Sequence, residues 1–239
     1  MIANVLSVIV SACSFLFTSY VLCRLTYFLS SHDIHIHSDD STEQAAFSNL
    51  FLDMLLLTVF ILQHSLMASN RFKQICCNLY IEHLSRSIYN ACNSVIVNFL
   101  INNWQQVPFY HFWHFSTSSS TVSILFNSLH VFAWSYIYSG CIMMDIAELY
   151  GLKQVFYRIS GRNSPLDNKS TELKRYMNHM RHPSFTGFLI VLWLYPFMSL
   201  DRMLLAIVFT GYMVVRWTTD PEDYNYHVRY FQQKQMELS

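Results

Sequence analysis

Residues 181–187 read Arg-His-Pro-Ser-Phe-Thr-Gly and place a guanidinium and an imidazole directly before an apolar segment. Pro183 has no backbone N–H and favours the first turn of a helix. Free N–H groups at a helix N-terminus bind anions, and Arg181 beside them adds positive charge. The segment can therefore hold a carboxylate. The alternative interpretation is an interfacial cap, with the arginine among lipid headgroups and the proline starting a membrane helix.

Ionisable residues also occur inside the apolar segments, where they are costly and normally face other helices. Asp53 and His64 lie 11 positions apart, so at about 100° per residue they share one helix face. They are separated by roughly 16 Å along the helix axis and therefore do not touch each other. Each is expected to have its own partner on another helix.

Two further segments carry polar stripes with helical spacing. One stripe runs through Asn127, His130, Trp134, Tyr138, Cys141 and Asp145, and the other through Asn90, Asn93, Ser94 and Asn98. The favoured interpretation is a seam of interhelical hydrogen bonds, worth about 0.6 kcal/mol per contact. The alternative is a functional cavity between the helices.

Long apolar runs are the elements that must position these residues. The chain is 53% hydrophobic and 13% charged, whereas a soluble domain carries about 25% charged residues. The runs predict an all-α bundle in the membrane, a single domain with spans near 2–22, 47–67, 88–103, 122–144, 185–200 and 203–217 and a tail at 218–239. The last two spans are short and are expected to form a helical hairpin.

Basic residues divide between the two sides of this arrangement. The loops 69–87 and 145–184, the tail and its membrane edge hold 13 of the 15 Lys and Arg residues, whereas the opposite side has Arg24 and Arg202. Basic loops remain on the cytosolic side of a membrane. Both termini are therefore expected in the cytosol or nucleoplasm.

The opposite side has a different composition. Residues 31–43 are acidic and rich in histidine, but they lack a fixed ligand spacing, so no metal site is expected. Residues 104–121 contain Trp104, Phe109, Tyr110, Phe112 and Trp113, which suit an aromatic belt at the membrane interface. The expected partner is the lipid bilayer, and nothing in the sequence points directly to a nucleic acid.

Four motifs in order carry a resemblance to a known family. They are Ile-Leu-Gln-His-Ser at 61–65, Glu-Leu-Tyr-Gly-Leu-Lys-Gln-Val-Phe-Tyr at 148–157, Arg-His-Pro at 181–183 and Asp-Arg-Met-Leu-Leu-Ala at 201–206. Together they resemble the nurim family, multi-pass proteins of the animal nuclear envelope. The resemblance implies residence in the inner nuclear membrane, with other nuclear envelope proteins as partners.

The nurim family is in turn similar to the isoprenylcysteine carboxyl methyltransferase superfamily. There, an Arg-His-Pro-x-Tyr-x-Gly segment opens the last helical hairpin and helps to bind S-adenosylmethionine, and an acidic pair follows the hairpin. The resemblance carries cofactor binding to Arg181, His182, Pro183 and Gly187, and a catalytic role to Glu222 and Asp223. This sequence departs from the pattern, because Phe185 replaces the tyrosine and the tail lacks the Phe-Gly and Val-Pro pairs.

Two functions follow as expectations. The first is a structural or resident component of the nuclear envelope. The alternative is an S-adenosylmethionine-dependent methyltransferase that acts on a membrane-embedded thiol, carboxylate or lipid. A transporter is disfavoured, because the sequence lacks the paired Gly- or Pro-broken spans that transporters often have.

Overall fold

The computed structural model describes residues 2–31, 43–108, 110–117, 119–165, 167, 169–170, 184–215 and 221–238. These residues are nearly all helical, as predicted. The helices are α1 (Ile2–Ser30), α2 (Glu43–Met67), α3 (Asn70–Asn78), the 3-10 turn η1 (Glu82–Leu84), α4 (Ser85–Asn103), α5 (Ser120–Met143), α6 (Ile146–Leu149), α7 (Leu152–Ile159), α9 (Phe185–Trp193), α10 (Leu200–Val215) and α11 (Pro221–Leu238). The strands are β1 (His111–His114) and β2 (Phe197–Ser199).

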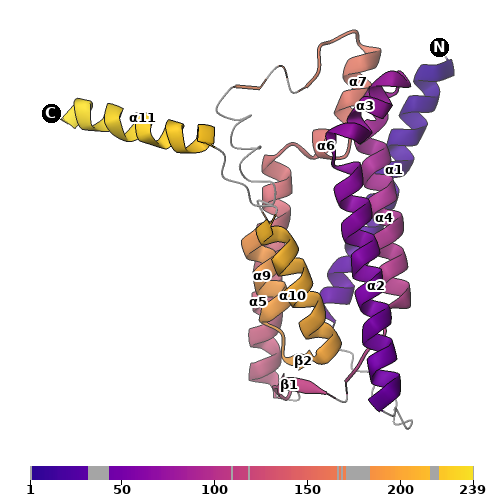
Figure 1. Ribbon diagram of the computed structural model, residues 1–239, viewed down its shortest axis with the longest axis vertical. Coiled ribbons are helices and arrows are strands. Elements are labelled where there is room, and N and C mark those ends of the chain that lie inside the picture. Colours follow the sequence, from indigo (N-terminus) through magenta and orange to yellow (C-terminus); the bar gives the residue numbers. More distant parts are fainter. Residues whose placement is uncertain are drawn as a thin grey trace.

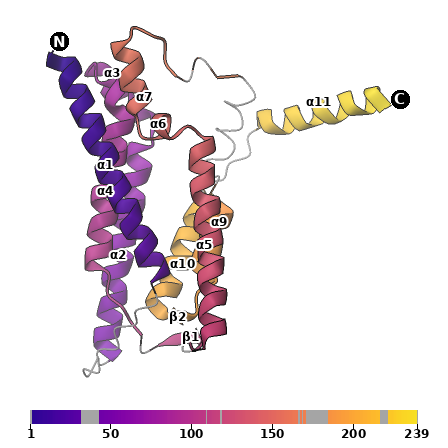
Figure 2. The same ribbon diagram turned by 180° about the vertical axis from the view of Figure 1, so that it is seen from behind.

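The long helices form two groups that run along the same axis. Helices α1, α2 and α4 lie side by side in one group, and α5, α9 and α10 form the other (Figures 1 and 2). Helix α10 packs against α2 and joins the groups. We call the end that carries α3, α6 and α7 the near end, and the end that carries β1 and β2 the far end. Helix α11 extends away from the bundle beyond the near end of α10 (Figure 1).

The apolar core lies where the two groups meet. It draws buried side chains from all six long helices: Leu29, Leu57, Leu100, Ala133, Val191 and Leu205. Many other large apolar side chains on α1, α2 and α5 are exposed, Leu16, Phe47 and Val131 among them. Apolar surface this extensive is unusual on a soluble monomer. Helices α1 and α2 (over Ala45–Met67) are long and apolar enough to cross a membrane by length and composition.

Several element boundaries differ from the sequence prediction. Helix α1 continues to Ser30, past Arg24, whose guanidinium donates a hydrogen bond to Asn98 Oδ1 on α4. Helix α9 ends at Trp193, where the sequence predicted helix to residue 200. Pro196 explains this end, since proline cannot donate a helix hydrogen bond and disfavours helical geometry in the residue before it.

A two-stranded antiparallel sheet closes the far end. Strand β1 pairs with β2 through His111 opposite Ser199 and His114 opposite Phe197, with an irregularity between His111 and Trp113. The sequence predicted an aromatic loop in this region and no strand. Trp113 donates from Nε1 to the Tyr195 carbonyl at 2.9 Å. The indole nitrogen of Trp113 is therefore hydrogen-bonded within the protein, whereas the side chains of Phe112 and Phe115 are exposed.

Candidate functional site

The expected cofactor segment falls mostly outside the described residues. Arg181, His182 and Pro183 belong to that undescribed part, and Glu222 and Asp223 lie in α11 with side chains that are not described. The flanking elements are informative nevertheless. Helices α9 and α10 form an antiparallel hairpin, so the start of α9 and the end of α10 lie at the same end of it (Figure 1). In the sequence, residues 181–183 precede α9, and residues 222–223 follow α10.

Gly187 is buried in a contact between α9 and α5. A Cβ atom at this position would lie 2.5 Å from Ile137 Cγ1 and 3.0 Å from the Ala133 carbonyl oxygen. Real Cβ atoms do not approach other atoms this closely. The glycine is therefore explained by close helix packing, which is a different role from the cofactor contact that the resemblance implies.

Asp53 has its partner in the chain that follows α4. Its side chain is completely buried, and its Oδ1 accepts a hydrogen bond of 2.9 Å from the Gln105 backbone N–H. The Oδ2 atom has no hydrogen-bond partner in the described structure. Asp53 thus fixes the course of the segment that leads from α4 into β1.

A second acidic residue, Asp201, holds the same segment from the other side. One carboxylate oxygen accepts from Trp104 Nε1 and the other from the Val107 backbone N–H, both at 3.0 Å. Asp53 and Asp201 therefore bind neighbouring backbone positions of one turn. Sequence reasoning missed this role, since it assigned Asp201 and Arg202 to the loop of the hairpin. An Asp-Arg pair between two apolar runs was the available signal.

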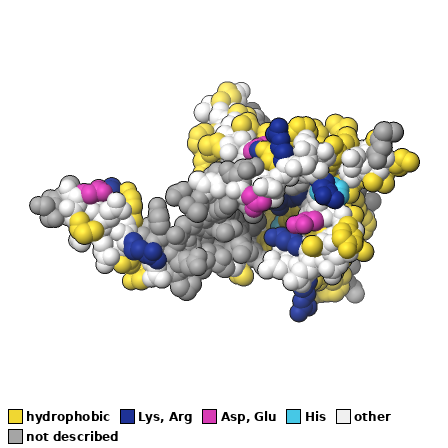
Figure 3. Space-filling view, turned by 90° about the horizontal axis from the view of Figure 1, so that it is seen from above, with side chains coloured by type: hydrophobic (Ala, Val, Ile, Leu, Met, Phe, Trp, Pro, Cys, Tyr) yellow, Lys and Arg dark blue, Asp and Glu magenta, His cyan; other side chains and the backbone are white. Residues whose placement is uncertain are grey.

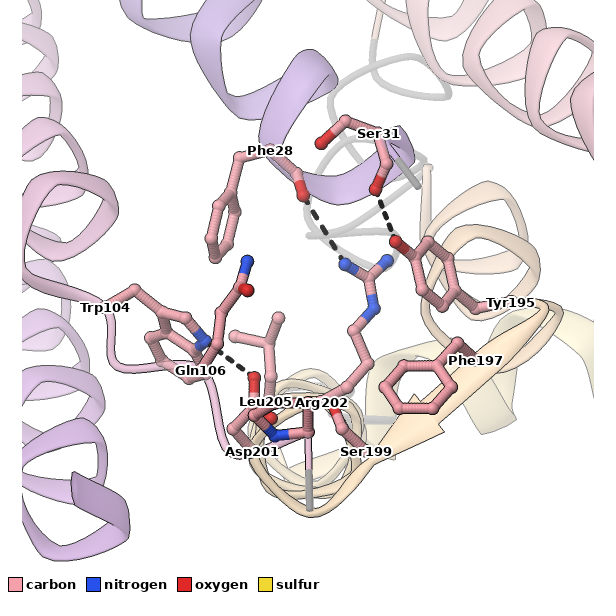
Figure 4. Close-up of a pocket in the computed structure, with 11 residues that line it drawn as sticks. Phe28, Ser31, Trp104, Gln106, Tyr195, Phe197, Ser199, Asp201, Arg202 and Leu205 are labelled. Carbon is pink, nitrogen blue, oxygen red and sulfur yellow. Dashed lines mark hydrogen bonds between the residues drawn. The ribbon is translucent and has the colours of Figure 1, made fainter. Parts of the chain in front are cut away.

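Arg202 occupies the centre of the far end. It is 7% exposed, and its guanidinium donates to the Phe28 and Leu29 carbonyls in the last turn of α1 (Figure 4). These carbonyls have no partner within the helix, and the negative end of the helix dipole favours a cation there. The guanidinium carbon also lies 3.7 Å from the centroid of the Tyr195 ring, a cation–π contact.

These residues line a small pocket at the far end. Phe28, Trp104, Tyr195 and Phe197 form its aromatic walls, and Gln106 and Arg202 contribute polar groups (Figure 4). The cavity volume is about 80 Å³, whereas pockets for drug-sized ligands hold about 300–1,000 Å³. It therefore suits a small polar group and is too small for an adenosyl cofactor.

His64 lies in a separate cluster between α2, α4 and α10. Its Nδ1 is 3.2 Å from Asn93 Oδ1, and the Tyr89 hydroxyl lies 3.1 Å from both ring nitrogens. The Tyr212 ring meets the imidazole edge-on, with the centroids 5.8 Å apart. Next to His64, Ser65 Oγ is 3.1 Å from the Tyr212 hydroxyl. His64 and Ser65 of the Ile-Leu-Gln-His-Ser motif thus join three helices.

The stripe on α5 is only partly used between helices. His130 is buried and contacts Ser30 Oγ through Nδ1 at 2.9 Å and the Leu194 carbonyl through Nε2 at 3.1 Å. Asn127 is exposed and bonds to Ser123 on its own helix. Asp145 is not on α5, which ends at Met143, so the prediction that Asp145 continues the intramembrane stripe was wrong. Its φ of 68° turns the chain out of the helix.

Charged side chains of both signs are visible at the near end (Figure 3). Asp145 caps α6 and forms a 2.5 Å ion pair with Lys153. The hydrogen bond from Lys153 lowers the pKa of Asp145. Glu148 pairs with Lys169 at 2.8 Å with both side chains about one-tenth exposed. Burial lowers the pKa of His83, whose Nε2 lies 3.0 Å from Ser7 Oγ on α1.

A glycine allows the near-end motif to dock on the bundle. Gly151 has a φ of 91°, and a Cβ there would lie 2.5 Å from Ser87 Oγ. The positive φ is the left-handed conformation that glycine adopts without strain. The Glu-Leu-Tyr-Gly motif thus places Leu149 so that its carbonyl accepts a 3.0 Å hydrogen bond from Asn90 Nδ2 on α4. Within the described ranges, no group of His, Cys, Asp and Glu side chains is arranged to hold a metal ion.

The curated proteins to which the chain is similar share one name. The chain is similar to the Nurim homolog of Drosophila pseudoobscura pseudoobscura, with 32% identity over 246 residues that cover 99% of this chain and 97% of the relative. The Nurim homolog of Drosophila melanogaster matches with 32% identity over 99% of this chain and 98% of the relative. Nurim of Homo sapiens is 35% identical over 77% of this chain and 71% of the relative. No family model and no solved structure matches the chain.

Proposed function

Because the chain belongs to the nurim family, we propose that it is a resident multi-pass protein of the inner nuclear membrane with a structural role. Membership of the family makes it a nurim-like membrane protein. We propose in addition that it resides in the inner membrane of the nuclear envelope and that its role there is structural.

This proposal rests on one observation: polar side chains on the facing helices form hydrogen bonds between helices. Polar groups on the facing helices are hydrogen-bonded to other parts of the bundle: Thr18 to Ser94, Arg24 to Asn98, Thr26 to Tyr138, His64 to Asn93, Asn90 to Leu149 and His130 to Ser30. Such bonds join helices within a membrane. Side chains that join helices in this way support an architectural role.

We further propose six spans, with both termini in the nucleoplasm and an arrangement like that of the methyltransferase superfamily. The concentration of basic residues at the near end supports this orientation. An added glycosylation site within 116–119 should be modified, whereas one within 160–165 should not. The opposite result would invert the topology.

Localisation has a separate test. A tag at the C-terminus should label the nuclear rim and, in cells permeabilised only at the plasma membrane, should be inaccessible to antibody. Full permeabilisation provides the matched control, because it should expose the tag. Antibody access after selective permeabilisation would place the protein outside the inner nuclear membrane.

A second candidate function, methyl transfer from S-adenosylmethionine, is favoured by the common near end of α9 and α10. The start of α9 and the end of α10 lie at the same end of the hairpin, and this supports a site shared by Arg181, His182, Glu222 and Asp223. The cofactor would supply the methyl group, and the arginine and imidazole would bind its carboxylate.

Calorimetry separates the two functions. The purified protein in detergent is titrated with S-adenosylmethionine and, in parallel, with S-adenosylhomocysteine. Micromolar binding that is lost in His182→Ala would support the methyltransferase and contradict a purely structural role. Absence of heat at millimolar ligand would exclude the methyltransferase. His83→Ala is the matched control, since His83 lies on the 3-10 turn η1 and outside the hairpin.

A further inference from the structure

The far-end pocket contains a buried cation, Arg202, that has no anionic partner among the described residues. No carboxylate in the described part of the chain lies within ion-pairing distance of Arg202, although its side chain is more than nine-tenths buried. Two of its nitrogens reach the end of α1, but Nε has no hydrogen-bond partner. A buried charge is costly unless it is paired and hydrogen-bonded. The missing partner is therefore an acceptor that the described part of the chain does not supply.

The pocket presents both signs of charge. Asp201 lines it together with Arg202, and the two residues are neighbours at the start of α10 (Figure 4). A simple anion would be attracted by Arg202 and repelled by Asp201. A group that is itself zwitterionic, with an anionic oxygen and an ammonium a few bonds apart, matches this pattern better.

The surroundings indicate where such a group comes from. Tyr110, Phe112 and Phe115 are exposed on the segment that contains β1. Aromatic side chains of this kind concentrate at the level of the lipid headgroups. The pocket lies at that same end of the bundle, between the end of α1 and the start of α10 (Figure 4). A headgroup from the adjacent leaflet is thus the nearest source of a zwitterion.

We propose that the far-end pocket binds the headgroup of one zwitterionic phospholipid of the phosphoethanolamine type. The lipid phosphate lies toward the Arg202 guanidinium, and the ammonium lies toward Asp201. The acyl chains remain in the bilayer against the apolar surface of the bundle. A small headgroup also fits the volume of about 80 Å³. The inference depends on the bundle being embedded in a membrane and is independent of both proposed functions.

Native mass spectrometry of the full chain in detergent tests this proposal. The probes are phosphatidylethanolamine, phosphatidylglycerol and inorganic phosphate. The wild-type protein should retain one phosphatidylethanolamine in preference to phosphatidylglycerol. Gln106→Trp should fill the pocket mouth and weaken retention by about tenfold, which corresponds to the loss of one charge-assisted hydrogen bond.

Asn102→Trp is the matched control, because it adds the same ring to an exposed position at the end of α4. It should retain lipid like the wild type, and thermal unfolding of both variants in detergent checks that each is folded. Equal retention by Gln106→Trp and the wild type would overturn the proposal. Preference for phosphatidylglycerol would overturn the zwitterionic assignment, and displacement of the lipid by millimolar inorganic phosphate would overturn the lipid source.

Discussion

The two ends of the bundle handle charge in opposite ways. At the far end Asp53, Asp201 and Arg202 are buried, and their described hydrogen bonds go mainly to backbone atoms of other elements. At the near end Asp145 and Lys153 pair with each other, and their side chains are 38% and 29% exposed. A buried charge that loses its partner costs far more than an exposed one. The buried far-end residues should therefore hold the bundle together, and the exposed Asp145–Lys153 pair at the near end should tolerate change.

Arg202→Met should lower the stability of the protein more than any other substitution considered. The substitution leaves the Phe28 and Leu29 carbonyls without donors and removes the contact with Tyr195. We expect the free energy of unfolding to fall by about 3 kcal/mol, measured by thermal unfolding in detergent. Arg162→Met at the exposed near end is the control and should change it by less than about 1 kcal/mol. Similar losses for both variants would remove the distinction between the ends.

Asp53→Ala should have the next largest effect. It leaves the buried Gln105 N–H without its acceptor, which costs about 2 kcal/mol. Asp53→Asn keeps an oxygen acceptor in the same place and should remain close to the wild type. If the asparagine variant is as unstable as the alanine variant, the negative charge itself, and not the hydrogen bond, stabilises the turn.

Gly187→Ala tests whether the contact between α5 and α9 is as tightly packed as the far end. The new methyl group would overlap Ile137 on α5, and overpacking of this kind costs about 1–2 kcal/mol. Gly211→Ala is the matched control on α10, because nothing lies within 4 Å of the added atom. It should be neutral or stabilising by up to about 1 kcal/mol, since alanine is the better helix former. Equal thermal stability of the two variants would contradict the close α5–α9 contact.

The near-end pair should show the smallest effect, and it should depend on pH. The hydrogen bond from Lys153 lowers the pKa of Asp145 below its ordinary value of 3.8, so the pair contributes above that value. Its contribution disappears as the pH falls through the lowered pKa. Because the pair is partly exposed, Asp145→Asn should cost about 0.5 kcal/mol at pH 7 and less at pH 2. A constant difference in unfolding temperature between these pH values would contradict this mechanism.

The sequence by itself determined the class and the family of this protein. Apolar runs and low charge predicted a nearly all-helical membrane protein, and four short motifs predicted the nurim family, which the relatives confirm. The 3.6-residue period also placed Asp53 and His64 on helix faces. These signals are local, because a helix face is set by residues three and four positions apart.

Only the tertiary structure decided which partners these residues have. Asp53 bonds to a backbone N–H 52 positions away, and Arg202 bonds to the end of α1 across 173 positions. The β1–β2 pairing joins segments with no shared sequence signal, and the Gly187 contact depends on how α9 meets α5. Such pairings depend on how whole elements pack, and packing depends on the shapes of surfaces that are distant in the chain. The Asp-Arg-Met-Leu-Leu-Ala motif supplies Asp201, Arg202 and Leu205 to the far-end pocket, but only this packing brings Phe28 and Trp104 beside them.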